Sequence, residues 1–235
     1  YGSSVRGNAQ ALYQTISAGV TDAAAATALL NSASRLSIGG ATDLTTAVDG
    51  LTSVVNAYRA SNLTAEDASD ILFTAIRNGK TTAEELSSSL GQVAPIASQL
   101  GVAFEDVAAA VSTITTNGVA TAEAVTQVRS ALIGVTKNTK AAQEVAAELG
   151  IDFSTTALEA KGLAQFLRDV VIESGASEGQ LLKLFGRVEG LQAALALTAQ
   201  NGKEFERQLG DMRERAGAAD AAFATMSGTL GFQIN

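Results

Sequence analysis

Apolar residues recur at alternating spacings of three and four along most of this chain. Such spacing gives a helix one hydrophobic face. Four sets follow it: Leu44, Val48, Leu51, Val55 and Tyr58; Leu86, Leu90, Val93, Ala97 and Leu100; Phe104, Val107, Val111 and Ile114; and Val125, Val128, Leu132 and Val135. The pattern predicts short amphipathic helices. Because Pro95 lies inside the second set, we expect that helix to be kinked or split.

Polar residues and glycines mark where these helices should begin and end. The triplet Thr-Ala-Glu starts at Thr64, Thr82 and Thr121. A threonine hydroxyl can accept hydrogen bonds from the first turn of a helix, and an acidic residue suits the positive end of the helix dipole. Helix ends are indicated by Gly79, Gly101, Gly118, Gly150 and Gly202. The predicted fold class is all-α, an array or bundle of short amphipathic helices.

Two pairs of segments resemble each other within the chain. Residues 78–84 read NGKTTAE and residues 117–123 read NGVATAE, while LGVAF at residues 100–104 is echoed by LGIDF at residues 149–153. These echoes are compatible with a weak helical repeat. They are also what shared helix-ending and helix-starting residues would produce, and the sequence leaves both interpretations open. Residues 151–156 are predicted to be a short extended piece or a loop.

The last part of the chain differs from the rest. A spacing of four and three is kept by Phe205, Leu209, Met212, Ala216, Ala219, Phe223 and Met226, with charged residues beside the first half. We predict one longer helix of coiled-coil character from about Lys203 to Met226. This divides the chain into a helical core domain, residues 1–200, and a segment leading out of it, residues 201–235. The partner predicted for this helix is another copy of the chain, bound through Phe205, Leu209, Met212, Phe223 and Met226. An amphipathic helix folded back on the domain is the alternative.

Composition narrows the possible chemistry. The 235 residues include no Cys, no His and one Pro, and aromatic residues make up 5%. Without Cys or His there are no disulfides, no thiol chemistry and no common transition-metal site. The net charge of −8 argues against specific nucleic-acid binding, because such binding relies on positive side chains that contact the phosphates. No apolar run approaches the length of a membrane span, and we expect the chain, which starts at Tyr1, to be an internal piece of a longer protein.

One motif could be mistaken for a catalytic site. Residues 175–179 read GASEG and fit the nucleophile-elbow pattern around Ser177. An elbow serine needs a histidine base, which this chain lacks. We therefore predict that Ser177 caps a helix, with Gln180 completing a capping box. No catalytic, cofactor-binding or metal-binding residue is predicted, and the arginines at 207, 213 and 215 are interpreted as part of a solvated helix face because acidic residues alternate with them.

The order of these motifs resembles the conserved core domain of phage tail tape-measure proteins. The resemblance covers roughly residues 9–202, and its most specific part is ILF at residues 71–73, NGK at 78–80, TAEEL at 82–86 and LGQVAP at 90–95. LFG at residues 184–186 and LQAAL at residues 191–195 resemble the closing part of that domain. No residue in these motifs has a catalytic role in the family, so the resemblance implies no active site.

The resemblance implies a structural role in a virion. A tape-measure protein scaffolds assembly of the tail tube from within its lumen, sets tail length and leaves ahead of the DNA. The implied partners are the tail-tube protein, tail assembly chaperones and baseplate or hub proteins. Two other functions stay open from the residues alone: a helical cytoplasmic adaptor or signalling module, and the helical part of a tail-associated peptidoglycan-degrading protein, for which a glutamate-based glycosidase would need neither His nor Cys.

Overall fold

A computed structural model describes residues 5–20 and 22–233. Within those ranges every regular element is helical and there is no strand, which confirms the predicted all-α class. The elements up to the middle of the chain are α1 (Val5–Ser17), α2 (Ala23–Gly39), α3 (Leu44–Ala57), η1 (Arg59–Ser61), α4 (Ala65–Asn78), α5 (Ala83–Leu90), α6 (Ala94–Gln99), α7 (Phe104–Thr116) and α8 (Thr121–Lys137). The remaining elements are α9 (Lys140–Leu149), α10 (Thr155–Leu167), η2 (Arg168–Glu173), α11 (Glu178–Phe185), α12 (Val188–Thr198), η3 (Ala199–Gly202), α13 (Lys203–Arg213) and α14 (Ala218–Gln233).

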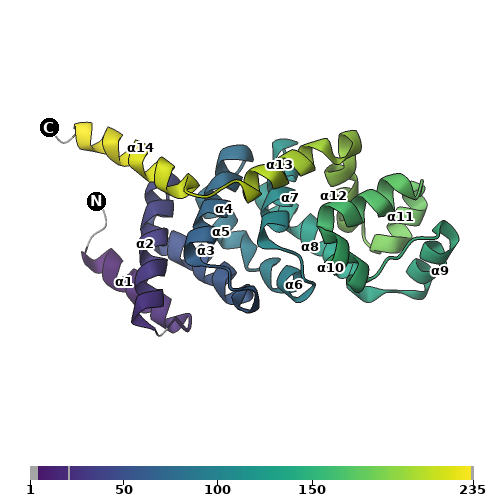
Figure 1. The fold of residues 1–235 in the computed structure, drawn as a ribbon, viewed down its shortest axis with the longest axis horizontal. Coiled ribbons are helices and arrows are strands. Elements are labelled where there is room, and N and C mark those ends of the chain that lie inside the picture. Colours follow the sequence, from purple (N-terminus) through teal and green to yellow (C-terminus); the bar gives the residue numbers. More distant parts are fainter. Residues whose placement is uncertain (1–4, 21, 234–235) are drawn as a thin grey trace.

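The helices form an elongated two-layer array (Figure 1). One layer contains α2, α4 and α7 in that order, and the other contains α3, α5 and α8. Successive pairs, α2 with α3, α4 with α5 and α7 with α8, therefore stack side by side. Helix α1 covers α3 at one end, and α9 to α12 form the other end, where α11 and α12 pack against α8.

The hydrophobic stripes predicted from the sequence point into the space between the layers. Leu51, Leu86, Val107 and Val128 are all buried. Helix α7 lies at the centre and is buried on nearly every side, since residues 104 and 106–115 are all buried. Its run of alanines and small polar residues suits that position, because small side chains let neighbouring helices approach closely.

The predicted helix boundaries are largely confirmed. The helix containing Pro95 is split into α5 and α6, with the proline in the first turn of α6. Thr64 and Thr82 cap α4 and α5, and Thr82 forms a full capping box with Glu85. Thr121 differs, because it is the first residue of α8 and is buried. Its hydroxyl instead lies 2.7 Å from the hydroxyl of Thr81. The two similar segments, residues 78–84 and 117–123, therefore lie side by side, one connecting α4 to α5 and the other connecting α7 to α8.

Residues 151–154 are a loop and not an extended strand. Phe153 from this loop is buried, with its ring centre 5.6 Å from that of Phe166 and 5.4 Å from that of Phe185. The loop is therefore held by an aromatic cluster, whose tilted and edge-on ring pairs are the favoured arrangements for such contacts.

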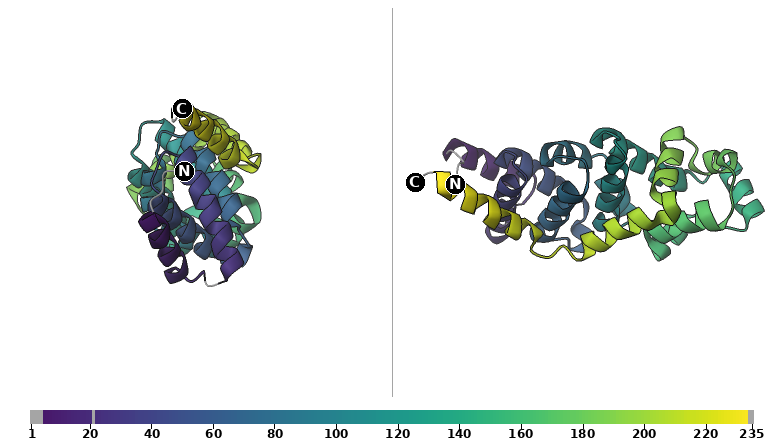
Figure 2. Two further views of the ribbon diagram at one scale, coloured as in Figure 1. Left: turned by 90° about the vertical axis from the view of Figure 1, so that its left-hand side faces the viewer. Right: turned by 90° about the horizontal axis from the view of Figure 1, so that it is seen from above.

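The prediction of one long C-terminal helix leading out of the domain is wrong. The chain breaks at residues 214–217, where Gly217 has a φ of +79°, and forms α13 and α14. We call residues 203–233 the strap, because they run back along the array over α7, α4 and α2 (Figures 1 and 2). The folded-back alternative from the sequence is therefore the observed arrangement. The domain boundary after residue 200 stays a prediction.

Candidate functional site

The apolar side chains of α13 attach the strap to the array. Phe205, Leu209 and Met212 are 2%, 5% and 0% exposed. These are the first residues of the predicted coiled-coil seam, and the coiled-coil prediction is corrected for them, because they belong to the core of their own chain. Phe223 is half-buried, and Met226 is exposed on the outer part of α14.

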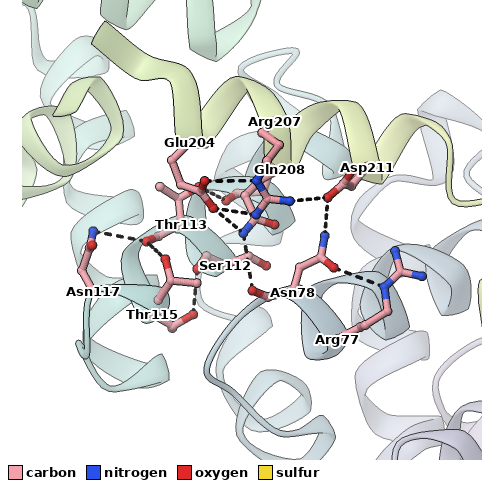
Figure 3. Close-up of polar contacts among 12 residues, drawn as sticks. Arg77, Asn78, Ser112, Thr113, Thr115, Asn117, Glu204, Arg207, Gln208 and Asp211 are labelled. Carbon is pink, nitrogen blue, oxygen red and sulfur yellow. Dashed lines mark hydrogen bonds and ion pairs between the residues drawn. The ribbon is translucent and has the colours of Figure 1, made fainter. Parts of the chain in front are cut away.

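A polar cluster joins α13 to the end of α4 (Figure 3). The side chain of Arg207 donates to Glu204 at 2.7 and 3.1 Å and to Asp211 at 2.8 Å. Asp211 also accepts from the amide of Asn78 at 2.8 Å, and this contact reaches from the strap to the array. The hydrogen bonds from Arg207 lower the pKa of Glu204, so both groups are held in their charged forms.

A second cluster surrounds the break between α13 and α14. The buried carboxylate of Asp70, from α4, accepts from the backbone N–H groups of Gly217 and Ala219 at 2.8 Å each. Arg215 lies 3.1 Å from Asp67 and 3.2 Å from Glu105. Asp70 thus satisfies amide groups at the start of α14, whereas α4, α5 and α11 satisfy theirs with their own capping residue.

Burial also changes the pKa of Asp106, which lies next to Glu105 of this cluster. Desolvation raises the pKa of the buried Asp106 carboxyl on α7, and the positive charge of Arg213 and the backbone N–H of Leu163 partly offset that effect. The three arginines at 207, 213 and 215 are therefore matched by carboxylates of the strap and the array. The prediction that these arginines lie on a solvated helix face therefore holds for Arg207, whose side chain is 53% exposed, but not for Arg215, whose side chain is only 14% exposed at the junction between the strap and the array.

The replacement of Asp70 by alanine is expected to release α14 from the array. The substitution leaves the N–H groups of Gly217 and Ala219 without acceptors at a buried junction, at a cost of about 1–3 kcal/mol for each unsatisfied group. Limited proteolysis should then cut within residues 214–217 faster than in the parent chain. Asp70→Asn is the matched control, because its amide oxygen keeps one acceptor. Equal cleavage of Asp70→Ala and the parent chain would show that this cap does not hold α14.

Residues 5–20 and 22–233 contain no group of three or more acidic residues placed to hold a metal ion. A cavity of about 240 Å³ is lined by residues that include Tyr58, Ser98 and Glu105. The hydroxyl of Tyr58 is already engaged, because it donates to the carbonyl oxygen of Val102 at 3.0 Å. None of the helices in the described ranges is both long and hydrophobic enough to traverse a bilayer.

Ser177 occupies the position predicted for a helix cap. It is the N-cap residue of α11, where its hydroxyl accepts from the N–H of Gln180 and the Gln180 side chain returns to the Ser177 N–H at 2.9 Å. Ser177→Ala is therefore expected to lower the free energy of unfolding by about 1 kcal/mol, the usual value of such a cap. Thermal unfolding would measure that change. A fluorophosphonate probe should leave Ser177 unlabelled, and labelling would overturn this interpretation.

Two features of this region were not predicted from the sequence. The role of Asp70 had no visible signal, because the amide groups that it caps lie more than a hundred residues later in the chain. The connection between α12 and α13 was indicated only by Gly202, although Gln200 and Asn201 are also left-handed, with φ of 52° and 64°. The Asn201-Gly202 pair is a common turn signal and could have located this turn.

Comparison with known proteins adds to this picture. Residues 1–186 match a family model described as phage-related minor tail protein. A probable tape measure protein of Clostridium phage phiCD119 is 29% identical over 238 residues, covering 94% of this chain and 24% of that protein. The tape measure protein of Pneumococcus phage Dp-1 is 23% identical over 201 residues, covering 82% of this chain and 17% of that protein. The chain thus spans about a quarter or less of the length of these relatives. No solved structure matches it.

Proposed function

Because the chain belongs to the phage-related minor tail protein family, we propose that it is the folded core section of a tape-measure protein. Family membership makes it a structural component of the phage tail. The proposal adds that the whole protein scaffolds assembly of the tail tube from within its lumen, sets tail length and leaves ahead of the DNA. The observation that carries the proposal is the family match over residues 1–186, which covers the array from α1 through α11.

The arrangement of the helices supports a division of labour within such a protein. A helix advances about 1.5 Å per residue, so a chain of this length drawn out as one helix would span roughly 350 Å. Here the longest helices, α2 and α8, have 17 residues each, and the chain turns back after each one. The array therefore contributes little length per residue. We propose that the ruler lies in sequence outside this chain, which corresponds to about a quarter of its first relative.

The proposed partners are other tail components. They include the tail-tube protein, the tail assembly chaperones and a baseplate or hub protein, which the resemblance to tape-measure proteins implies. Self-association stays part of the proposal, although Phe205, Leu209 and Met212 would have to leave their own array to reach a second copy. The relatives carry the names of structural proteins, and we propose no enzymatic role. A muralytic assay on the purified chain tests this, because digestion of peptidoglycan would contradict it.

In-frame deletion of helical sequence outside this chain is expected to shorten the tail in proportion to the residues removed. The physical reason is that an extended helix converts residue number directly into distance, at about 1.5 Å per residue. Electron microscopy of assembled tails would measure the change. The control is a deletion of equal length from a region predicted to be disordered, which should shorten tails by a different amount per residue. Unchanged tail length after several helical deletions would refute the ruler role.

A further inference from the structure

The connection between α12 and the strap has an unusual backbone. Gln200, Asn201 and Gly202 are consecutive left-handed residues, with φ of 52°, 64° and 76°. This is the only run of adjacent left-handed residues within the described ranges. Glycine adopts this conformation freely, but a side chain with a Cβ atom crowds the backbone there, and glutamine lacks the tolerance that asparagine has. The turn that folds the strap back onto its own array is therefore strained.

The surface beneath the strap requires a specific occupant. The carboxylate of Asp70 is buried in the array, where it accepts hydrogen bonds from the backbone N–H groups of Gly217 and Ala219. A helix of unrelated sequence would leave that charge buried and unpaired, which is strongly unfavourable. It would also have to replace the side chains of Phe205 and Met212, which fill the apolar part of the interface. Another copy of the strap meets all of these requirements.

We propose that the strap exchanges between two copies of this chain. In the exchanged dimer the strap of each copy lies on α7, α4 and α2 of the other, and residues 199–202 are extended. Every contact that the strap makes with α7, α4 and α2 within one chain is kept, so the exchange alters only the hinge with its local contacts and the number of chains. Relief of the left-handed turn favours the exchanged form, and a strained hinge is a known promoter of such swapping. This inference specifies the self-association that is part of the proposed function, but it is argued from the fold alone and can fail while the tape-measure role stands.

The absence of cysteine from the chain allows a direct test. A Cβ atom added to Gly39 of α2 would lie 3.0 Å from the Cβ of Ala222 on α14, which is close enough for a disulfide after a small adjustment. Full-length chains carrying Gly39→Cys alone and Ala222→Cys alone, each with a different affinity tag, would be mixed at high concentration and then oxidised. The proposal predicts a disulfide between the two differently tagged chains, in a fraction with the mass of a dimer.

A matched control uses Gly179→Cys in place of Gly39→Cys. Gly179 lies in α11, has no neighbouring atom within 4 Å of an added Cβ and is outside the strap interface, so it measures random collision. A chain carrying both Gly39→Cys and Ala222→Cys is the positive control. Its monomer should form an internal disulfide, which shows that cysteines at these two positions can be joined. If that chain closes its disulfide while the mixed chains give no more product than the Gly179→Cys control, the proposal is overturned.

Two hinge variants provide an independent measurement. Deletion of Gln200 and Asn201 removes the turn that lets the strap fold back, so the mass in solution should double. Gln200→Gly with Asn201→Gly relieves the strain while keeping the length, so the fraction of dimer should fall below that of the parent chain. Light scattering after size separation would report both masses. A deletion variant that is folded and monomeric would overturn the proposal, and the cysteine mixture decides the question if that variant does not fold.

Discussion

Deletion of Thr82 to Leu100 is expected to abolish infectivity. The deletion removes α5 and α6, which pack against α3, α8 and α7. Leu86, Leu90 and Val93 are buried, and each such side chain contributes about 1.5–3 kcal/mol when it is taken out of water. Their loss also exposes the facing surfaces of α3 and α8. The total reaches the roughly 5–15 kcal/mol by which a typical domain is stable, so the array should not fold.

Plaque titre and electron microscopy of the resulting particles would measure this effect. The expected result is a failure to assemble tails or to deliver DNA. Ser88→Ala is a suitable control, because Ser88 is exposed on α5 and its replacement leaves the packing intact. A graded version is Leu86→Ala, which should cost about 2–5 kcal/mol and lower the titre without a deletion. Normal infectivity after the deletion would show that this folded section is dispensable.

Gly134→Ala is expected to lower the free energy of unfolding by about 1–3 kcal/mol, the usual cost of overpacking a core. An added Cβ on Gly134 would lie 2.6 Å from the carbonyl oxygen of Phe185 and 2.9 Å from its Cα. These are backbone atoms at the end of α11, so no side-chain rotation can relieve the clash. Helix α8 and the end of α11 would have to separate, although they pack directly against each other.

The matched control is Gly210→Ala. Gly210 lies inside α13 and has open space where a Cβ would be. Because alanine favours a helix over glycine by about 1 kcal/mol, this variant should be more stable than the parent chain. Chemical denaturation of both variants would measure the two changes, which are predicted to have opposite signs. Equal stability of the two variants would mean that α8 and the end of α11 are not in close contact.

Local sequence signals determined much of the fold. The stripe containing Leu51 and the stripe containing Val128 each identify a buried helix face, because one side of a helix repeats every three or four residues. Caps such as Thr82 and Ser177 are encoded within four residues of the atoms that they bind. The lack of His left the Ser177 motif without a histidine base, and the structure shows Ser177 as the cap of α11 that the sequence predicted. The order of the motifs pointed to the same family as the later match over residues 1–186.

What the sequence could not decide is the surface against which a buried face packs. The spacing of Phe205, Leu209 and Met212 is the same for a coiled coil with another copy and for a helix that packs on its own array. Only the tertiary structure shows these side chains buried between the strap and the array, and only it brings Asp70 to the start of α14. The physical reason is the separation along the chain of the residues that determine each feature. A stripe or a cap depends on neighbours along the chain, whereas the position of the strap depends on contacts between residues far apart in sequence and on the turn at residues 200–202.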